Sequence, residues 1–160
     1  MDLSKKNDSD KSEVYIEDTT MQEMFLKTTG RLNRLRYFKR IMVVTLISLL
    51  IDCFLITIFS DAWGNLTSLG DKLTSIVGII TLIPGYCLDV RRLQDLDQND
   101  LLAKISLVLG FITIFISTGD IFSPSKSELL VYFGYTVIAL YMLFVPGTKG
   151  ENKYGPDPLG

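Results

Sequence analysis

Four apolar runs divide the chain, and polar or charged stretches separate them. They extend from Ile41 to Phe59, from about Leu73 to Leu88, from Ile105 to Gly119 and from Leu129 to Val145. A helix rises about 1.5 Å per residue and a bilayer core is about 30 Å thick, so runs of this length predict membrane-spanning helices. The third run has 15 uncharged residues, a length that also suits a re-entrant segment. We therefore expect an all-α integral membrane bundle of four transmembrane helices.

The sequence before the first apolar run divides into a tail and a short helix. Residues 1–20 are polar and lack apolar periodicity, which predicts a disordered cytoplasmic tail. Glu23 stands three residues after Thr20, a spacing that predicts a capping box, and Met21, Met24 and Phe25 follow at helical spacing. The membrane domain, residues 21–158, is thus expected to begin with a short amphipathic helix.

Lys and Arg alternate between rich and poor segments along the chain. The segment from Lys27 to Arg40 holds six of them, the three loops between the runs hold one, three and one, and the segment after the fourth run holds two. Cytoplasmic segments of membrane proteins are enriched in Lys and Arg. This bias predicts that the N-terminus, the second loop and the C-terminus all lie in the cytoplasm.

Composition removes several kinds of chemistry from consideration. The chain has 160 residues, a formal net charge of -2 and no histidine, and its mean hydropathy of +0.30 is high for a soluble domain. The two cysteines, Cys53 and Cys87, fall in apolar runs at different predicted depths, which argues against a zinc site and against a disulfide between them. We expect no catalytic residue, no metal, no cofactor and no nucleic-acid partner.

Asp52 is the acid that lies deepest in a predicted span. Acids within a membrane usually face the bundle interior and often mark an ion or proton pathway. The alternative is a protonated Asp52 that is hydrogen-bonded to a hydroxyl such as that of Thr81 or Thr113. The sequence leaves both readings open.

Small and hydroxyl-bearing residues recur at spacings of three and four in every predicted span. Such residues allow close backbone approach and hydrogen bonds between membrane helices. They predict the interior face of each helix, which comprises Thr45, Ser48 and Asp52 in the first span, Ser75, Gly78, Thr81 and Gly85 in the second, Ser106, Gly110, Thr113 and Ser117 in the third, and Tyr132, Thr136 and Ala139 in the fourth.

Three polar motifs fall on the predicted cytoplasmic side. They are GRLNRLRYF at residues 30–38, RRLQDLDQN at 91–99 and GTKGENKYGPDP at 147–158. Together, over about residues 30–158, they resemble the small bacterial inner-membrane proteins called domain of unknown function 805. The resemblance implies a multi-pass protein of the bacterial inner (plasma) membrane, but no activity. Gln94 stands where that family usually has histidine.

The motifs bring arginines and acids to one predicted level. Guanidinium groups pair with carboxylates or with phosphates, so we expect either an internal Arg–Asp cap or a site for anionic lipid headgroups. The candidate residues are Arg31, Arg34, Arg91, Arg92, Asp95, Asp97, Asn152, Tyr154 and Asp157.

Three functions fit these features. The first is a non-enzymatic bundle that binds membrane lipids or a protein partner through a polar cytoplasmic cap. The second is a small channel, transporter or transporter subunit that uses Asp52, for which a homo-oligomer would be needed. The third is a lipid-directed enzyme that holds a divalent cation between Asp95 and Asp97. Of these, we expect the first.

Overall fold

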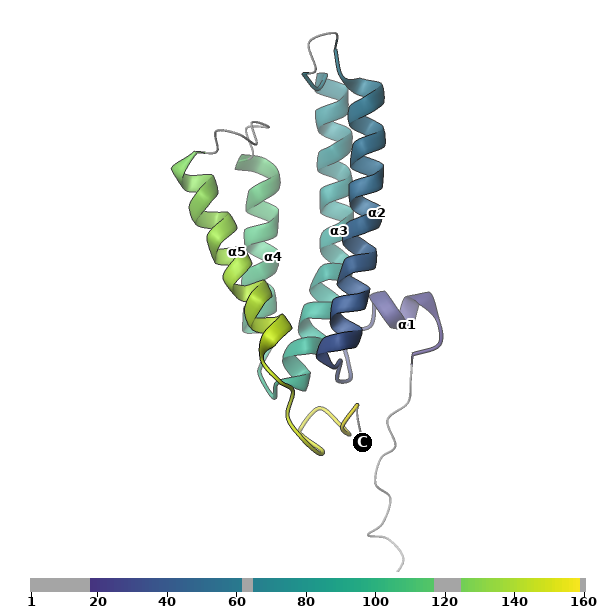
Figure 1. Ribbon diagram of the computed structural model, residues 1–160, viewed down its shortest axis with the longest axis vertical. Coiled ribbons are helices and arrows are strands. Elements are labelled where there is room, and N and C mark those ends of the chain that lie inside the picture. The colour runs from purple at the N-terminus through teal and green to yellow at the C-terminus, as the bar shows by residue number, and fades with distance from the viewer. Residues whose placement is uncertain (1–17, 62–64, 117–124, 159–160) are drawn as a thin grey trace, which may run out of the picture.

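The computed structural model describes residues 18–61, 65–116 and 125–158, and within these ranges it has five helices and no β-sheet. The short α1 (Met21–Phe25) precedes α2 (Arg34–Phe59), α3 (Ser68–Asp95), α4 (Leu101–Ile116) and α5 (Lys126–Phe144) (Figure 1). The all-α prediction is confirmed for this part of the chain.

Three helices, α2, α3 and α5, are long and apolar enough to cross a membrane, and α4 is a shorter apolar helix. They correspond to the predicted spans 41–59, 73–88, 129–145 and 105–119, although residues 117–119 lie outside the described ranges. Both α2 and α3 extend beyond their spans into the charged motifs. The side chain of Asn33 caps α2 by accepting a hydrogen bond of 2.9 Å from the Arg36 amide, so the motif residues after Asn33 are helical.

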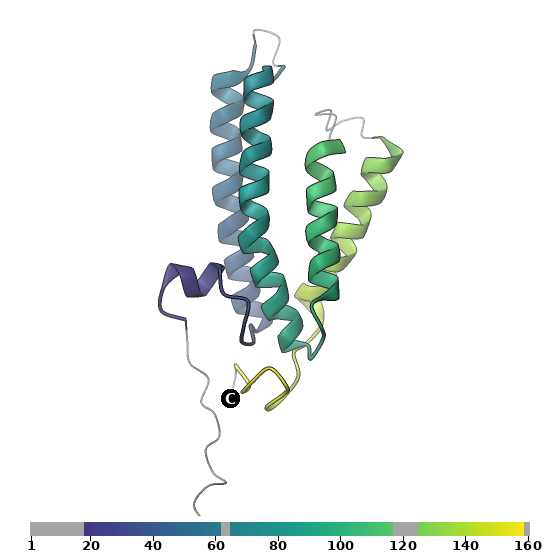
Figure 2. The ribbon, with the colours of Figure 1, turned by 180° about the vertical axis from the view of Figure 1, so that it is seen from behind.

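The four long helices form two hairpins, α2 with α3 and α4 with α5 (Figure 1). The hairpins lie close together at the end where α2 begins and diverge toward the other end (Figures 1 and 2). Contacts between the hairpins are mainly those of α3 with α4. The end at which they meet, which we call the closed end, also receives α1 and the segment after α5.

Glycines allow α3 and α4 to approach closely. A Cβ atom at Gly110 would lie 2.6 Å from Cδ2 of Leu82, and one at Gly78 would lie 3.2 Å from Cδ1 of Ile114. The predicted packing role of small residues is therefore seen at this helix pair. The predicted interior face of α5 is wrong, because Tyr132 and Thr136 are exposed there.

Buried apolar side chains gather at the closed end. Elsewhere the helices expose large apolar side chains, such as Leu130 at 72% and Phe133 at 68%, which suits a lipid environment and not water. The buried cluster comprises Leu32, Tyr37, Leu88, Val90, Leu93, Leu96, Ala103 and Met142.

The N-terminal prediction needs one correction. Thr20 and Glu23 form the expected capping box at the start of α1, but Asp18, which falls inside the predicted tail, is buried with only 5% of its surface exposed. Two arginines pair with it, as described below, and this pairing accounts for its burial. The remainder of the predicted tail, residues 1–17, lies outside the described ranges.

Candidate functional site

Arg31 and Asp95 form the centre of a buried polar cluster at the closed end. Nε of Arg31 donates to Oδ1 of Asp95 at 3.2 Å, and Nη2 lies 3.1 Å from the same oxygen. The remaining N–H groups of Arg31 donate to the backbone carbonyls of Thr148, Gly150 and Gly155. Every donor of this guanidinium therefore has an acceptor within the protein, and the residue is only 1% exposed.

Arg92 occupies the other side of Asp95. Its Nη1 donates to Oδ2 of Asp95 at 2.5 Å, and its Nε donates to the Met142 carbonyl at 2.7 Å. Further hydrogen bonds reach the Val145 and Leu32 carbonyls. The last carbonyls of a helix have no partner within that helix, so Arg92 satisfies the end of α5 while it pairs with an acid on α3.

Arg91, the preceding residue, binds the segment that contains α1. Its Nη2 donates to Oδ2 of Asp18 at 2.7 Å and its Nη1 to the Glu23 carbonyl at 3.0 Å, while Arg40 donates to the same Asp18 oxygen at 2.7 Å. Burial acts to raise the pKa of Asp18, but the hydrogen bonds and charges of Arg91 and Arg40 outweigh burial and lower this pKa. We call Arg31, Arg91, Arg92, Asp18 and Asp95 the arginine cap.

The segment after α5 packs directly against the arginine cap. The Thr148 amide donates to the Asp95 carbonyl at 2.9 Å, and Nδ2 of Asn152 donates to the Gln94 carbonyl at 2.9 Å. A Cβ atom at Gly147 would lie 2.7 Å from Cγ of Asp95, so only glycine fits at that position without a shift. The backbone of the third motif is thus bonded to the end of α3.

The other predicted cap residues occupy different positions. Asp157 accepts a hydrogen bond of 2.9 Å from the Gly150 amide, and the Tyr154 amide donates to Oδ1 of Asn152, so both belong to the turn after α5. Asp97 lies at the surface, where Oδ1 is 3.6 Å from Nζ of Lys153. Arg34 is exposed, and its side chain has no hydrogen bond or ion pair within the described ranges. The structure therefore does not place Arg34 and Asp97 with the buried cluster.

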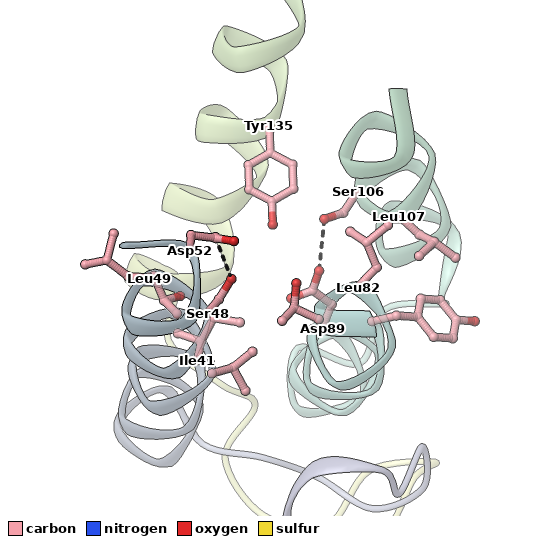
Figure 3. Close-up of a pocket in the computed structure, with 14 residues that line it drawn as sticks. Ile41, Ser48, Leu49, Asp52, Leu82, Asp89, Ser106, Leu107 and Tyr135 are labelled. Carbon is pink, nitrogen blue, oxygen red and sulfur yellow. Dashed lines mark hydrogen bonds between the residues drawn. The ribbon is translucent and has the colours of Figure 1, made fainter. Parts of the chain in front are cut away.

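A cavity of about 300 Å³ with both apolar and polar walls opens between the two hairpins, and Asp52 lies on its wall. Oδ2 of Asp52 accepts a hydrogen bond of 3.4 Å from Ser48 (Figure 3). Oδ1 is buried and has no partner among the described residues. The expected partners were wrong, because the Thr81 and Thr113 hydroxyls donate to carbonyls of their own helices.

Asp89 of α3 lies on the same cavity, and this position was not predicted. Oδ1 accepts a hydrogen bond of 2.9 Å from the Tyr37 hydroxyl, and Oδ2 accepts one of 3.0 Å from Ser106. Figure 3 shows the hydroxyl of Tyr135 pointing between Asp52 and Ser106. The predicted second span ended at Leu88 because the next residue, Asp89, is charged. In the structure α3 continues to Asp95 and carries Asp89 inside the bundle.

The arrangement of the acids bears on the enzymatic alternative. Asp95 is 2% exposed and engaged by two arginines, whereas Asp97 is paired with Lys153 at the surface. Their carboxylates are thus turned to different surroundings and do not converge on one cation. In the described ranges, no group of three or more Cys, Asp or Glu residues is placed to hold a metal ion.

Comparison with known proteins places the sequence motifs in a wider context. The model of a family described as protein of unknown function (DUF805) matches residues 25–156. The chain is 28% identical over 86 residues to the inner membrane protein YhaH of Escherichia coli strain K12, and equally to YhaH of strain O157:H7. The alignment covers 54% of this chain and 52% of each relative, so it spans about half of those proteins. No solved structure matches the chain.

Proposed function

Since the chain belongs to the DUF805 family of proteins of unknown function, and its Escherichia coli relatives are named inner membrane proteins, we propose that it is a multi-pass inner-membrane protein that binds anionic lipid without catalysing a reaction. The binding site in this proposal is the surface around Arg34. The arginines of the cap are not that site, because they are buried and bonded to acceptors of the protein itself.

The topology in this proposal has four crossings, with both ends of the described chain in the cytoplasm. Arg31 before α2, Asp95 at the end of α3 and Thr148 after α5 are in direct contact. The start of α2, the end of α3 and the segment after α5 therefore share one end of the bundle. Those segments are also the ones rich in Lys and Arg, which favours the cytoplasmic face for that end.

An exposed, unpaired arginine beside an apolar groove is the observation that carries the proposal. Arg34 borders a groove of about 340 Å³ whose other walls are Leu35, Phe38, Leu143 and Phe144. Leu35 and Phe144 are 58% and 68% exposed. A guanidinium at headgroup level pairs with phosphate, and the apolar walls contact the upper part of an acyl chain.

Arg34→Gln tests this site. In nanodiscs of mixed phosphatidylglycerol and phosphatidylcholine, native mass spectrometry of the released protein counts the phosphatidylglycerol molecules that stay bound. We expect the affinity for retained phosphatidylglycerol to fall about fivefold, since one arginine near the membrane surface contributes about 1 kcal/mol. Phosphatidylcholine retention should not change.

Lys39→Gln is the matched control, because Lys39 is an exposed cation on the same helix outside the groove. If both variants lose phosphatidylglycerol equally, only the general basic charge of this face acts and the groove is not a site. If Arg34→Gln retains as much phosphatidylglycerol as the unaltered protein, the proposal is wrong.

Transport is a second candidate, favoured by the cavity on whose walls the acids Asp52 and Asp89 lie. A route across the membrane would extend this cavity through a homo-oligomer or beside another membrane protein. The first step on any such route is the binding of a ligand in the cavity.

A further inference from the structure

The cavity between the hairpins has two acids on its walls. The carboxylates of Asp52 and Asp89 come from α2 and α3, and the hydroxyls of Ser48, Ser106 and Tyr135 lie around them (Figure 3). Within the described ranges, neither Lys nor Arg lines it. A carboxylate inside a membrane segment is stabilised by a cationic partner, and no residue of the described ranges supplies one on these walls.

Asp52 has an acceptor that the protein leaves unused. Its Oδ1 atom is buried and has no hydrogen-bond partner in the described chain, and the bond from Ser48 to Oδ2 is long at 3.4 Å. Asp89, by contrast, accepts one hydroxyl hydrogen bond at each oxygen. A buried acceptor without a donor destabilises a fold by about 1–3 kcal/mol, so this atom is suited to a donor that arrives with a ligand.

The size and the lining of the cavity indicate the class of ligand. The cavity has a volume of about 300 Å³, and a neighbouring space of about 270 Å³ has Ile41, Thr45 and Tyr135 among the lining residues that the two share. Small-molecule sites begin at about 300 Å³ and are mostly apolar with a few polar groups. Inorganic cations such as Ca²⁺ instead need six or more oxygens close together, whereas much of this wall is Ile41, Val44, Leu49, Leu82 and Leu107.

From these observations we propose that the cavity binds an organic cation, a protonated amine on an apolar body. The ammonium group donates to Oδ1 of Asp52 and lies in the field of Asp89, and the apolar body contacts the aliphatic side chains of α2, α3 and α4. Neither Asp52 nor Asp89 is among the residues that line the lipid groove at Arg34, so either proposal can fail without the other.

Binding of 1-naphthylmethylamine to the full-length protein tests the assignment. The probe is fluorescent and cationic at neutral pH, and 1-naphthalenemethanol is its neutral analogue of nearly equal shape. Fluorescence polarisation is measured in phosphatidylcholine nanodiscs, with empty nanodiscs subtracted. We expect saturable binding of the amine and none of the alcohol.

Two variants report on the cavity itself. Asp52→Asn keeps the shape and removes the charge, and we expect about tenfold weaker amine binding, the size expected for a hydrogen bond to a charged group. Thr45→Phe places a ring in both spaces from an exposed position and should abolish binding. Asp71→Asn is the control, because Asp71 is an exposed acid in the first turn of α3 and does not line the cavity.

The other outcomes overturn the proposal. Equal binding of amine and alcohol would show apolar partition only. An unchanged affinity in Asp52→Asn or in Thr45→Phe would place the probe elsewhere on the protein. Displacement of the amine by Na⁺ at equal concentration would assign the cavity to an inorganic cation instead.

Discussion

A single residue, Asp95, joins three segments that are far apart in the sequence. The side chain of Asp95 accepts hydrogen bonds from Arg31, which precedes α2, and from Arg92, and its carbonyl accepts two from Thr148, which follows α5. All three side chains of these two ion pairs are nearly inaccessible to solvent. Removal of one partner of a buried ion pair leaves a desolvated charge, which costs more than the pair contributes while it is intact.

Asp95→Ala should therefore destabilise the fold strongly. We expect a loss of about 3–5 kcal/mol, because two buried guanidinium groups lose their shared carboxylate. The measurement is reversible unfolding of the full chain in mixed micelles. Asp97→Asn, two residues away, removes the charge of an exposed partner of Lys153, suits the positive φ of 55° at this position, and should cost no more than about 1 kcal/mol. Equal losses in the two variants would contradict a buried role for Asp95.

The motifs indicated that arginine and aspartate side chains would form the cap, but they did not indicate every residue that takes part. Arg31, Arg91, Arg92 and Asp95 were predicted as a possible internal Arg–Asp cap, and the structure pairs Asp95 with Arg31 and Arg92. Asp18 was missed because the polar tail contains several acids and only the folded chain selects one of them. Asp89 was missed because a charge was taken to end a span, whereas hydroxyls from α2 and α4 solvate it inside the bundle.

At the scale of elements, α1 is attached to the bundle by polar contacts rather than by a broad apolar face. Its five residues include none that is buried. The pairs of Asp18 with Arg91 and Arg40 connect this segment to α3 and α2. A further bond runs from Nη1 of Arg91 to the Glu23 carbonyl. Ionised Asp18 thus contributes to the attachment of α1, together with the packing of Phe25 against the buried cluster.

The stability that Asp18 contributes should disappear in acid. Its folded-state pKa lies below the ordinary value of 3.8, so the contribution is complete above that value and is lost as the pH falls through the lowered pKa. The measurement is the difference in unfolding free energy between the unaltered protein and Asp18→Asn. We expect a constant difference from neutral pH down to about 4 and a decreasing one below it.

Asp100→Asn provides the comparison for this pH series. Asp100 is a half-exposed acid that pairs with Lys104 one helical turn away, and surface pairs of this kind contribute about 0–1 kcal/mol. A difference for Asp18→Asn that persisted unchanged in strong acid would show that its charge does not hold α1.

The apolar runs located the helices well, and their ends less well. The positions of the apolar runs predicted where α2, α3, α4 and α5 lie. The charged residues that end an apolar run, however, do not end the helix. Helix α2 begins at Arg34, ahead of the apolar run, because Asn33 caps it, and it therefore includes Arg36 and Tyr37. Helix α3 likewise continues beyond its apolar run, from Asp89 to Asp95. Hydrophobicity reports the solvent around a segment, whereas capping and hydrogen bonds decide where the helix begins and ends.

For the whole molecule, the family and the inner-membrane location expected from the motifs are confirmed by the comparisons. The divergence of the two hairpins was not predicted (Figure 1). The packing faces depend on which side of each helix is turned to lipid, and apolar residues occupy both sides in such a bundle. For that reason the interior face of α5 could not be read from hydroxyl spacing.

Labelling of single cysteines tests the four-crossing topology. In a Cys53→Ala, Cys87→Ala background, cysteines are placed at Thr67, Asn99, Ser125 and Lys149. A membrane-impermeant maleimide applied to intact spheroplasts should label the first and third positions, and it should reach the second and fourth only after permeabilisation. Asn99 and Lys149 on opposite faces would show that α4 or α5 does not cross.

The hydrogen bonds of Arg31, the partner of Asp95, also determine when the closed end can fold during synthesis. Arg31 is made early, but three of its acceptors are the carbonyls of Thr148, Gly150 and Gly155, which leave the ribosome only after α5. Until then the guanidinium must remain hydrated, and the closed end cannot become dry. The cap therefore closes only after every helix of the described bundle has been made, and a nascent chain that stops before Thr148 is left with exposed charges that distinguish it from the finished protein.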